Sequence, residues 1–234
     1  MDIHKRKLWN ENHKKLTNII HKTEEHEQTL RLFLSQHALL HSSSITNTNQ
    51  ITLEDSVFDN LDESIFRAYP VANPDTKNSI AWHIWHISRI EDMTMNILVA
   101  NGQQVLNEGR WLEKLQIDVP HSGNDMSESE IADVSSKISF HSLLSYRAAV
   151  GRQTRQVITS LEAGQFKMKV DSMRIQRLMD ENAVSQSSKW LAEYWSKKTV
   201  GGLILMPATR HNFLHLNKCN RIKERLHKKA FTTK

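Results

Sequence analysis

The 234-residue sequence has little of what disulfide-rich, all-β or membrane-spanning proteins require. Its single cysteine, Cys219, excludes an internal disulfide and fits a reducing compartment. Seven glycines and four prolines are few for the many tight turns of an all-β fold. The longest apolar run, residues 200–208, is much shorter than the roughly 20 residues that cross a bilayer. These absences predict a helical protein without a transmembrane segment.

The sequence also has no apolar stretch behind its basic N-terminal residues, which indicates no signal peptide and predicts a cytoplasmic protein. The formal charge is +5, and lysines and arginines gather at residues 4–7 and 218–229. Such clusters can bind nucleic acid or acidic lipids, but they also complement the dipole at a solvated helix end. Because no nucleic-acid-binding motif accompanies them, we favour the solvated helix end and expect neither membrane nor nucleic acid as a partner.

Apolar residues recur at helical spacing over most of the chain, which predicts an all-α fold. Four expected helices are long, which favours a four-helix bundle with long crossover connections and extra short helices. The length suits one domain over residues 1–234, with residues 1–20 as an N-terminal extension and 229–234 as a flexible basic tail. We expect four long helices, at residues 8–41 (with a break at 21–25), 79–101, 128–161 (with a break near Ser139), and from Lys189 or Lys197 to 228. We also expect short helices at 53–69 and 171–182 and a loop at 41–50.

Several residues mark the ends or bends of these helices. Asn78 and Ser79 can cap the helix that follows them. Ser127 and Glu130 have the spacing of a capping box. Pro207 lies within the last helical stretch and predicts a kink there.

Three histidines occupy inward positions of otherwise apolar helical faces. On a helical wheel His86 is central on the stripe formed by Met93 and Ile97, and His211 lies on one face with His215, one turn further along. Packing alone gives no reason for imidazoles on such faces, whereas a transition-metal ion does, because neutral imidazole is a good ligand. Three protein ligands with an open position are typical of a catalytic metal site.

The spacing of four residues between histidines is weak support by itself. In a sequence with 13 histidines, chance predicts about 0.7 such pairs. The second pair, His37 and His41, precedes the serine-rich stretch at 41–50, so we interpret it as surface or boundary polar residues. For His211 and His215 the alternative is a pair of core histidines with hydrogen-bond partners.

The stretch from Ser79 to Asp92, together with the late pair His211 and His215, resembles the DinB-like superfamily of four-helix-bundle metalloproteins. That superfamily includes bacillithiol transferases and a mycothiol-dependent maleylpyruvate isomerase. Its members share a pattern in which a histidine stands two residues after a hydrophobic residue, is followed directly by another hydrophobic residue, and precedes a glutamate by five positions. His86 and Glu91 match this pattern. The resemblance extends over about residues 28–228. It implies a DinB-like bundle with a divalent ion, Zn or Ni, bound by His86, His211 and His215.

The resemblance leaves the reaction open, because many members end with a His-His-Arg-Gly-Gln type of sequence and this chain has His215-Leu-Asn-Lys-Cys219. We expect a metal-dependent enzyme of the thiol S-transferase or hydrolase type, acting on a small molecule, with a low-molecular-weight thiol as the co-substrate of a transferase. The alternatives are a non-enzymatic stress or regulatory bundle with a structural metal, and a nucleic-acid-associated protein that uses its basic termini. We also expect a homodimer. His83 could replace or assist His86.

Other residues near the histidines have a structural and a functional interpretation. Glu91 lies about 140° around the helix from His86, so we expect it to face a neighbouring helix. Trp82 and Trp85 could line a substrate pocket, but aromatic residues at this spacing usually belong to the core. Cys219 could be a soft ligand, but a lone helical cysteine is more often a small buried hydrophobe.

Overall fold

The computed structural model describes residues 3–46 and 49–232. Within these residues the chain forms helices and two isolated β-bridges but no extended strand, which confirms the predicted all-α fold. The helices are α1 (Ile3–Ile19), α2 (His26–Ala38), α3 (Ser43–Thr46), α4 (Leu53–Phe58), α5 (Glu63–Arg67), α6 (Ile80–Asp92), α7 (Val105–Glu108), α8 (Trp111–Leu115), α9 (Glu128–Lys137), α10 (Phe140–Thr159), α11 (Ser172–Asp180), α12 (Lys189–Ser196), α13 (Val200–Leu205) and α14 (Asn212–Thr232). Short 3₁₀ turns are η1 (Thr23–Glu25), η3 (Gln165–Lys167) and η4 (Gln186–Ser188), and wider π-helical turns are η2 (Met93–Val99) and η5 (Met206–His211).

Most helix positions follow the periodicity of the sequence. The first long stretch is broken by η1, as expected at residues 21–25, and the break near Ser139 separates α9 from α10. The stretch at 53–69 differs from the prediction because it holds two short helices, α4 and α5, and the expected loop at 41–50 contains α3. Helix α14 continues to Thr232, and the last two residues of the predicted basic tail lie outside the described residues.

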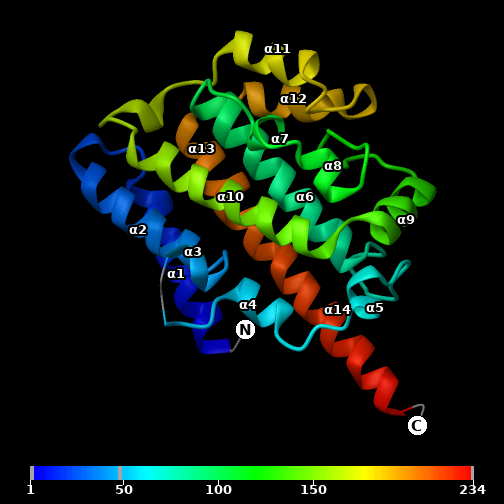
Figure 1. Ribbon diagram of the computed structural model, residues 1–234. Coiled ribbons are helices and arrows are strands. Elements are labelled where there is room, and N and C mark those ends of the chain that lie inside the picture. The colour runs from blue at the N-terminus through cyan, green and yellow to red at the C-terminus, as the bar shows by residue number, and fades with distance from the viewer. Residues whose placement is uncertain (1–2, 47–48, 233–234) are drawn as a thin grey trace.

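Helix α6 is the centre of the bundle. It packs against α10 and α14, while α2 contacts α10 and α1 contacts α13 (Figure 1). Every residue from Ser79 to Val99 is buried, so α6 and η2 are enclosed on all sides. A helix with no exposed face requires partners inside the protein for each of its polar side chains.

Caps define where the central helices begin. The Ser79 hydroxyl accepts a hydrogen bond from the Trp82 backbone N–H at 3.0 Å, and it starts α6. Ser127 and Glu130 form the expected capping box at the start of α9. These caps satisfy backbone donors that have no partner in the first helical turn.

The last long helix is distorted at Pro207, as the sequence predicts. Proline has no backbone N–H, so it cannot make the usual helical hydrogen bond. In η5 the Thr209 hydroxyl donates to the carbonyl oxygens of Ile204 and Leu205, at 3.1 and 2.8 Å. His13 of α1 contacts the Leu205 carbonyl at 3.0 Å. The widened turn ends at His211 and therefore sets the direction from which this side chain leaves the helix.

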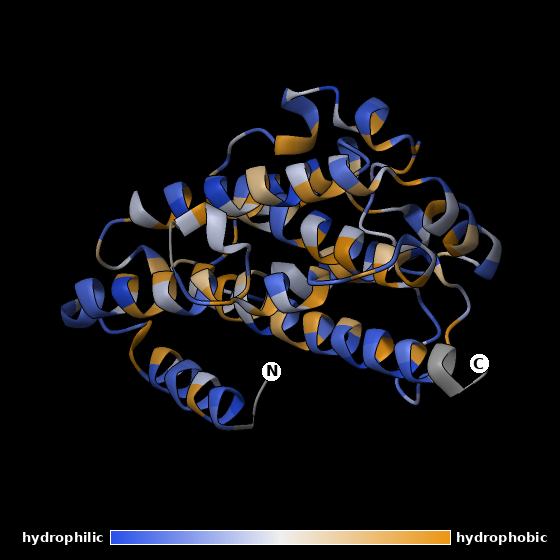
Figure 2. Ribbon diagram, turned by 60° about the horizontal axis from the view of Figure 1, so that its bottom comes forward, coloured by the Kyte–Doolittle hydropathy of each residue, from blue (hydrophilic) through white to orange (hydrophobic). Residues whose placement is uncertain are grey.

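The hydrophobic colour lies mainly on the inward sides of the helical ribbons, and the outer side of the helix that leads to the C-terminus is largely hydrophilic (Figure 2). The buried apolar residues form two clusters, one centred on the first half of α6 and the other on η2. Among the described residues, none of the helices combines the length and the hydropathy that a membrane crossing needs.

The interpretation of His37 and His41 as surface or boundary residues is wrong. Both side chains are fully buried and form hydrogen bonds to the Glu91 carboxylate of α6. The serine-rich stretch that follows them does not expose them, because α2 contacts α10 and η5 on this side. The partner is 50 or more residues away in the sequence, so local composition could not indicate it.

The tight packing of His41 against α10 leads to a stability prediction. A Cβ added at Gly151 would lie 2.5 Å from His41 Nδ1, and the ring cannot move away because Glu91 holds it. Gly151→Ala should therefore lower the free energy of unfolding by about 1–3 kcal/mol, measured by chemical denaturation. Gly202→Ala is the matched control, because its Cβ would meet neighbours at 3.5 Å or more, and it should leave stability unchanged or raise it. Equal stability of the two variants would contradict this packing.

Candidate metal centre

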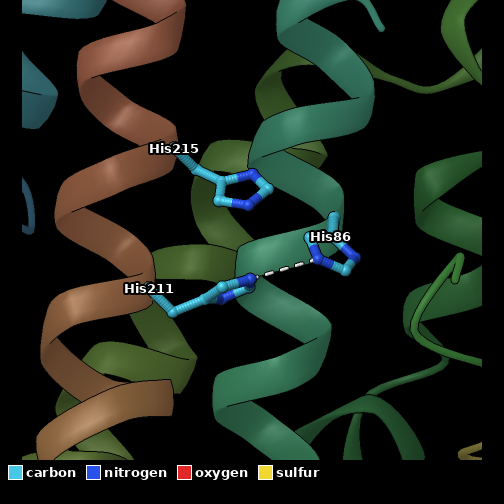
Figure 3. A group of neighbouring side chains, drawn as sticks. All are labelled: His86, His211 and His215. Atoms are coloured by element: carbon cyan, nitrogen blue, oxygen red, sulfur yellow. Dashed lines mark hydrogen bonds between the residues drawn. The ribbon is translucent and has the colours of Figure 1, made fainter. Parts of the chain in front are cut away.

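The structure brings His86, His211 and His215 together between α6 and the junction of η5 with α14 (Figure 3). One nitrogen from each ring lies within 4.8 Å of the others. The Nε2 atoms of His86 and His211 are 3.2 Å apart. The sequence predicts that His211 and His215 lie one turn apart on the same helix face and that this face turns toward the helix of His86.

His86 is held in one orientation by its surroundings. Its Nδ1–H donates to the Ser122 carbonyl at 2.7 Å, and its ring stacks on Trp82 with a centroid distance of 4.6 Å. Because Nδ1 carries the proton in this hydrogen bond, Nε2 has a free lone pair directed toward His211. A backbone carbonyl on the second ring nitrogen is a common way to orient a metal-binding histidine.

His83 supports His215 and is not a member of the three-histidine group. Its Nδ1 is 2.9 Å from His215 Nδ1, and its Nε2 is 3.0 Å from the Thr76 hydroxyl oxygen. One assignment of protons has His215 donating to His83 and His83 donating to Thr76. That assignment leaves the Nε2 lone pair of His215 free. Of the two roles expected for His83, this geometry corresponds to assisting the site.

Burial keeps the three rings neutral at ordinary pH. It lowers the pKa of His86 to about 4, against the effect of the Ser122 carbonyl, which raises it. Burial also lowers the pKa of His211 and of His215 well below the usual value, and the neighbouring imidazoles lower both further. The neutral form is the one that binds a metal ion.

The residues fit a divalent transition-metal ion. Two nitrogens each about 2.1 Å from an ion are about 3.2 Å apart when they subtend about 100°, which is the distance between the Nε2 atoms of His86 and His211. The buried Nδ1 atom of His211 has no hydrogen-bond partner, so among the described residues the only hydrogen bond of this ring is the one between its Nε2 and His86. Three imidazoles without a carboxylate favour Zn, Ni, Cu or Fe over Mg or Ca.

Cys219 is a buried thiol outside this group. It lies in the first half of α14 and belongs to the apolar core there, and burial raises its pKa to about 12. A thiol with so high a pKa is protonated and is a poor ligand. The burial of Cys219 agrees with its interpretation as a small buried hydrophobe.

A cavity of about 230 Å³ opens beside His86 and His211. No charged side chain is among the described residues that line it, and three of those residues are aromatic. Trp82 and Trp85, which the sequence offered as pocket walls, are both buried and do not line it. The lining residues are His86, Ile90, Asn124, Trp190, Leu191, Tyr194, Trp195, Met206, Pro207 and His211.

Sequence reasoning missed the residues that complete the cavity. Trp190, Tyr194 and Trp195 come from α12, and Asn124 comes from the loop before α9. The Trp190 indole N–H donates to Asp125 at 2.7 Å, which joins α12 to that loop. The amphipathic pattern of α12 marks a packed helix, but nothing local indicates that it faces the histidines.

The comparisons with known proteins agree with this fold. The sequence model of the DinB superfamily matches residues 52–218, so the chain belongs to the DinB superfamily. No curated protein matches the chain. A crystal structure of a conserved protein from Enterococcus faecalis is similar in fold, with 16% sequence identity, a TM-score of 0.50, and coverage of 86% of this chain and 96% of that one. Residues 37 and 41 precede the matched region.

The motif around His86 also contains a buried ion-pair network. The Asp92 carboxylate accepts hydrogen bonds from Arg89 at 2.9 Å, from the Tyr146 hydroxyl at 2.6 Å, and from the backbone N–H groups of Val105 and Leu106. Arg89 and Asp92 are fully buried. Arg89 also donates to the carbonyl of Pro120, in the loop that holds the Ser122 carbonyl against His86. This pair therefore anchors the loop that orients His86.

Removing the charge of Asp92 should destabilise the protein. Asp92→Asn leaves Arg89 buried without a counter-ion and places an amide N–H₂ among donors, so we expect a loss of about 3 kcal/mol in the free energy of unfolding. The control is Asp133→Asn, whose partner Lys137 is exposed and whose loss should have little effect. Urea denaturation compares the two, and an unchanged midpoint for Asp92→Asn would rule out an anchoring role for the pair.

Proposed function

We propose that this protein binds one Zn or Ni ion through His86, His211 and His215 and catalyses transfer of a thiol to an apolar electrophile. The observation that carries the proposal is the convergence of three imidazoles beside an uncharged, aromatic cavity. Membership of the DinB superfamily supports the metal, because that superfamily often binds divalent metals. Zn and Ni suit an all-imidazole donor set.

When bound, the ion would lower the pKa of a thiol or a water molecule and so provide a nucleophile at neutral pH. The chain's own contribution is positioning. The Ser122 carbonyl and the Trp82 ring fix His86, and His83 fixes His215. The apolar walls of the cavity exclude water from the group that is attacked.

The cavity favours an apolar or aromatic substrate. Trp190 and Tyr194 are 49% and 43% exposed, which leaves aromatic surface available to a ligand. An ionic substrate would find no counter-charge among the described residues that line the cavity. A volume of about 230 Å³ suits one ring or a short chain rather than a large molecule.

The absence of a carboxylate among the described residues that line the cavity favours thiol transfer over hydrolysis. Hydrolysis uses a group that moves protons to and from the reacting atoms, commonly a carboxylate or a further histidine. Both oxygens of Glu91, the carboxylate on α6, are occupied by His37 and His41. In thiol transfer the sulfur bonds to an electrophilic carbon, the leaving group departs with its electron pair, and the thiol proton passes to solvent. The low-molecular-weight thiol that this needs is reduced in the cytoplasm, which we propose as the location.

The metal proposal predicts a loss of metal in one histidine variant. Purified without an affinity tag, the wild type should contain metal at the three-histidine site, and His211→Ala should lose that ion because two remaining imidazoles bind it too weakly. His141→Ala removes an exposed histidine elsewhere and should keep the metal. Mass spectrometry measures the metal content, and circular dichroism verifies folding. A folded His211→Ala variant with undiminished metal at this site would contradict the proposal.

The transferase proposal predicts different KM values for two variants of Tyr194 in the cavity. Zn-loaded or Ni-loaded protein should consume a thiol in the presence of an apolar aryl halide or epoxide. Tyr194→Asp places a carboxylate in the cavity and should raise KM about tenfold or more, whereas Tyr194→Phe keeps the apolar ring and should leave KM near wild type. Metal content should be unchanged in both variants.

Other outcomes of the same assays identify the alternatives. Ester or amide hydrolysis without thiol consumption would indicate a hydrolase. Metal binding without turnover of either substrate class would indicate a non-enzymatic bundle with a structural metal. Binding to DNA with a steep salt dependence would indicate use of the basic termini. A concentration-dependent mass in solution would test the expected homodimer.

A further inference from the structure

A second group of ligand-type side chains lies in the core, and none of its members lines the apolar cavity. It consists of His37 from α2, His41 from the turn that follows α2, and Glu91 from α6, and we call it the second cluster. His37 Nε2 is 2.9 Å from Glu91 Oε1, and His41 Nε2 is 3.1 Å from Glu91 Oε2. All three side chains are fully buried.

The arrangement places two imidazole nitrogens close to the two oxygens of one carboxylate. Each imidazole faces a different oxygen of the same carboxylate, and the imidazole centroids are 4.2 Å apart. Two donor atoms each about 2.1 Å from an ion and about 3 Å apart subtend about 90° at that ion. Two nitrogens with a carboxylate that provides both oxygens therefore match four-coordinate binding of a transition metal.

The buried negative charge of Glu91 also favours a cation beside it. Glu91 accepts hydrogen bonds from His37, His41 and Asn212, which is the environment of an ionised carboxylate. The nearby guanidinium of Arg147 is bonded to Glu54 at 2.5 Å, so its charge is already compensated. A buried carboxylate without a cation is costly. A proton can occupy only one of the two stacked rings favourably, whereas one divalent ion uses both rings and both oxygens.

The residues around the second cluster are arranged as supports for its ligands. Asn212 donates to Glu91 Oε2 at 2.8 Å, and the Glu54 carboxylate is 4.0 Å from His41 Nδ1. A carboxylate behind a histidine and a hydrogen bond to a carboxylate ligand are common around metal sites. Nδ1 of His37 is buried without a hydrogen-bond partner, so the protein satisfies only one of the two nitrogens of this ring.

We propose that His37, His41 and Glu91 form a second site, for a structural divalent transition-metal ion that ties α2 to α6. Its three side chains are fully buried and would supply four donor atoms with no open position, which distinguishes it from the first site. His37 and His41 lie outside the region matched to the superfamily, so the site is a feature that the N-terminal helices add to the bundle. The proposal does not depend on catalysis at the three-histidine site.

The test uses full-length variants that separate the two sites. The double variant His86→Ala/His211→Ala removes the first site, and His37→Gln/His41→Gln removes the second, because glutamine still donates to Glu91 but is a poor transition-metal ligand. Each protein is refolded from guanidinium with Zn²⁺, so that ions can reach a fully buried site, and is then dialysed against a chelator. Metal content and thermal midpoint are measured before and after the chelator.

We expect about two ions per chain in the wild type and about one in each double variant. The ion left in His86→Ala/His211→Ala should resist the chelator and raise the thermal midpoint, and Co²⁺ in its place should give the absorption of a four-coordinate site. A folded His86→Ala/His211→Ala protein without metal would overturn the second site, even if the wild type binds one ion. This readout remains decisive if His37→Gln/His41→Gln fails to fold.

Discussion

The enclosure of α6 is the constraint on which the rest of the structure depends. Every residue from Ser79 to Val99 is buried, yet α6 carries five ionisable side chains that need partners: His83, His86, Arg89, Glu91 and Asp92. An unpaired buried charge or polar group costs free energy comparable to a large share of a protein's net stability. The helices around α6 therefore have to supply specific partners as well as apolar surface.

These partners divide the surface of α6 into three faces. One face meets η5 and α14 with His86 and His83, the second meets α2 with Glu91, and the third meets α10 with Asp92, whose partner there is Tyr146. The faces are connected through Asn212, which donates to Glu91 and to the Pro207 carbonyl and accepts from Arg147. Asn212 immediately follows His211, so the buried network fixes the end of η5 and, with it, the direction of one proposed ligand.

Much of the local structure could be predicted because its causes are local. Ser79 and the pair Ser127 and Glu130 cap helices through hydrogen bonds over three residues, and Pro207 distorts its own turn. The facing of Glu91 away from His86 followed from the angle between them on one helix. The burial of His37 and His41 could not be predicted, because it depends on a carboxylate brought close only by folding.

The sequence by itself determined that the chain is helical, where its main helices begin, and that His86, His211 and His215 lie on inward faces, since periodicity and capping act over a few residues. Only the tertiary structure decided what those faces meet. It placed His83 behind His215, set α12 as the aromatic wall of the cavity, and brought α2 against Glu91. These outcomes depend on contacts between residues far apart in the chain. The free energy of such contacts is determined only when the whole core packs.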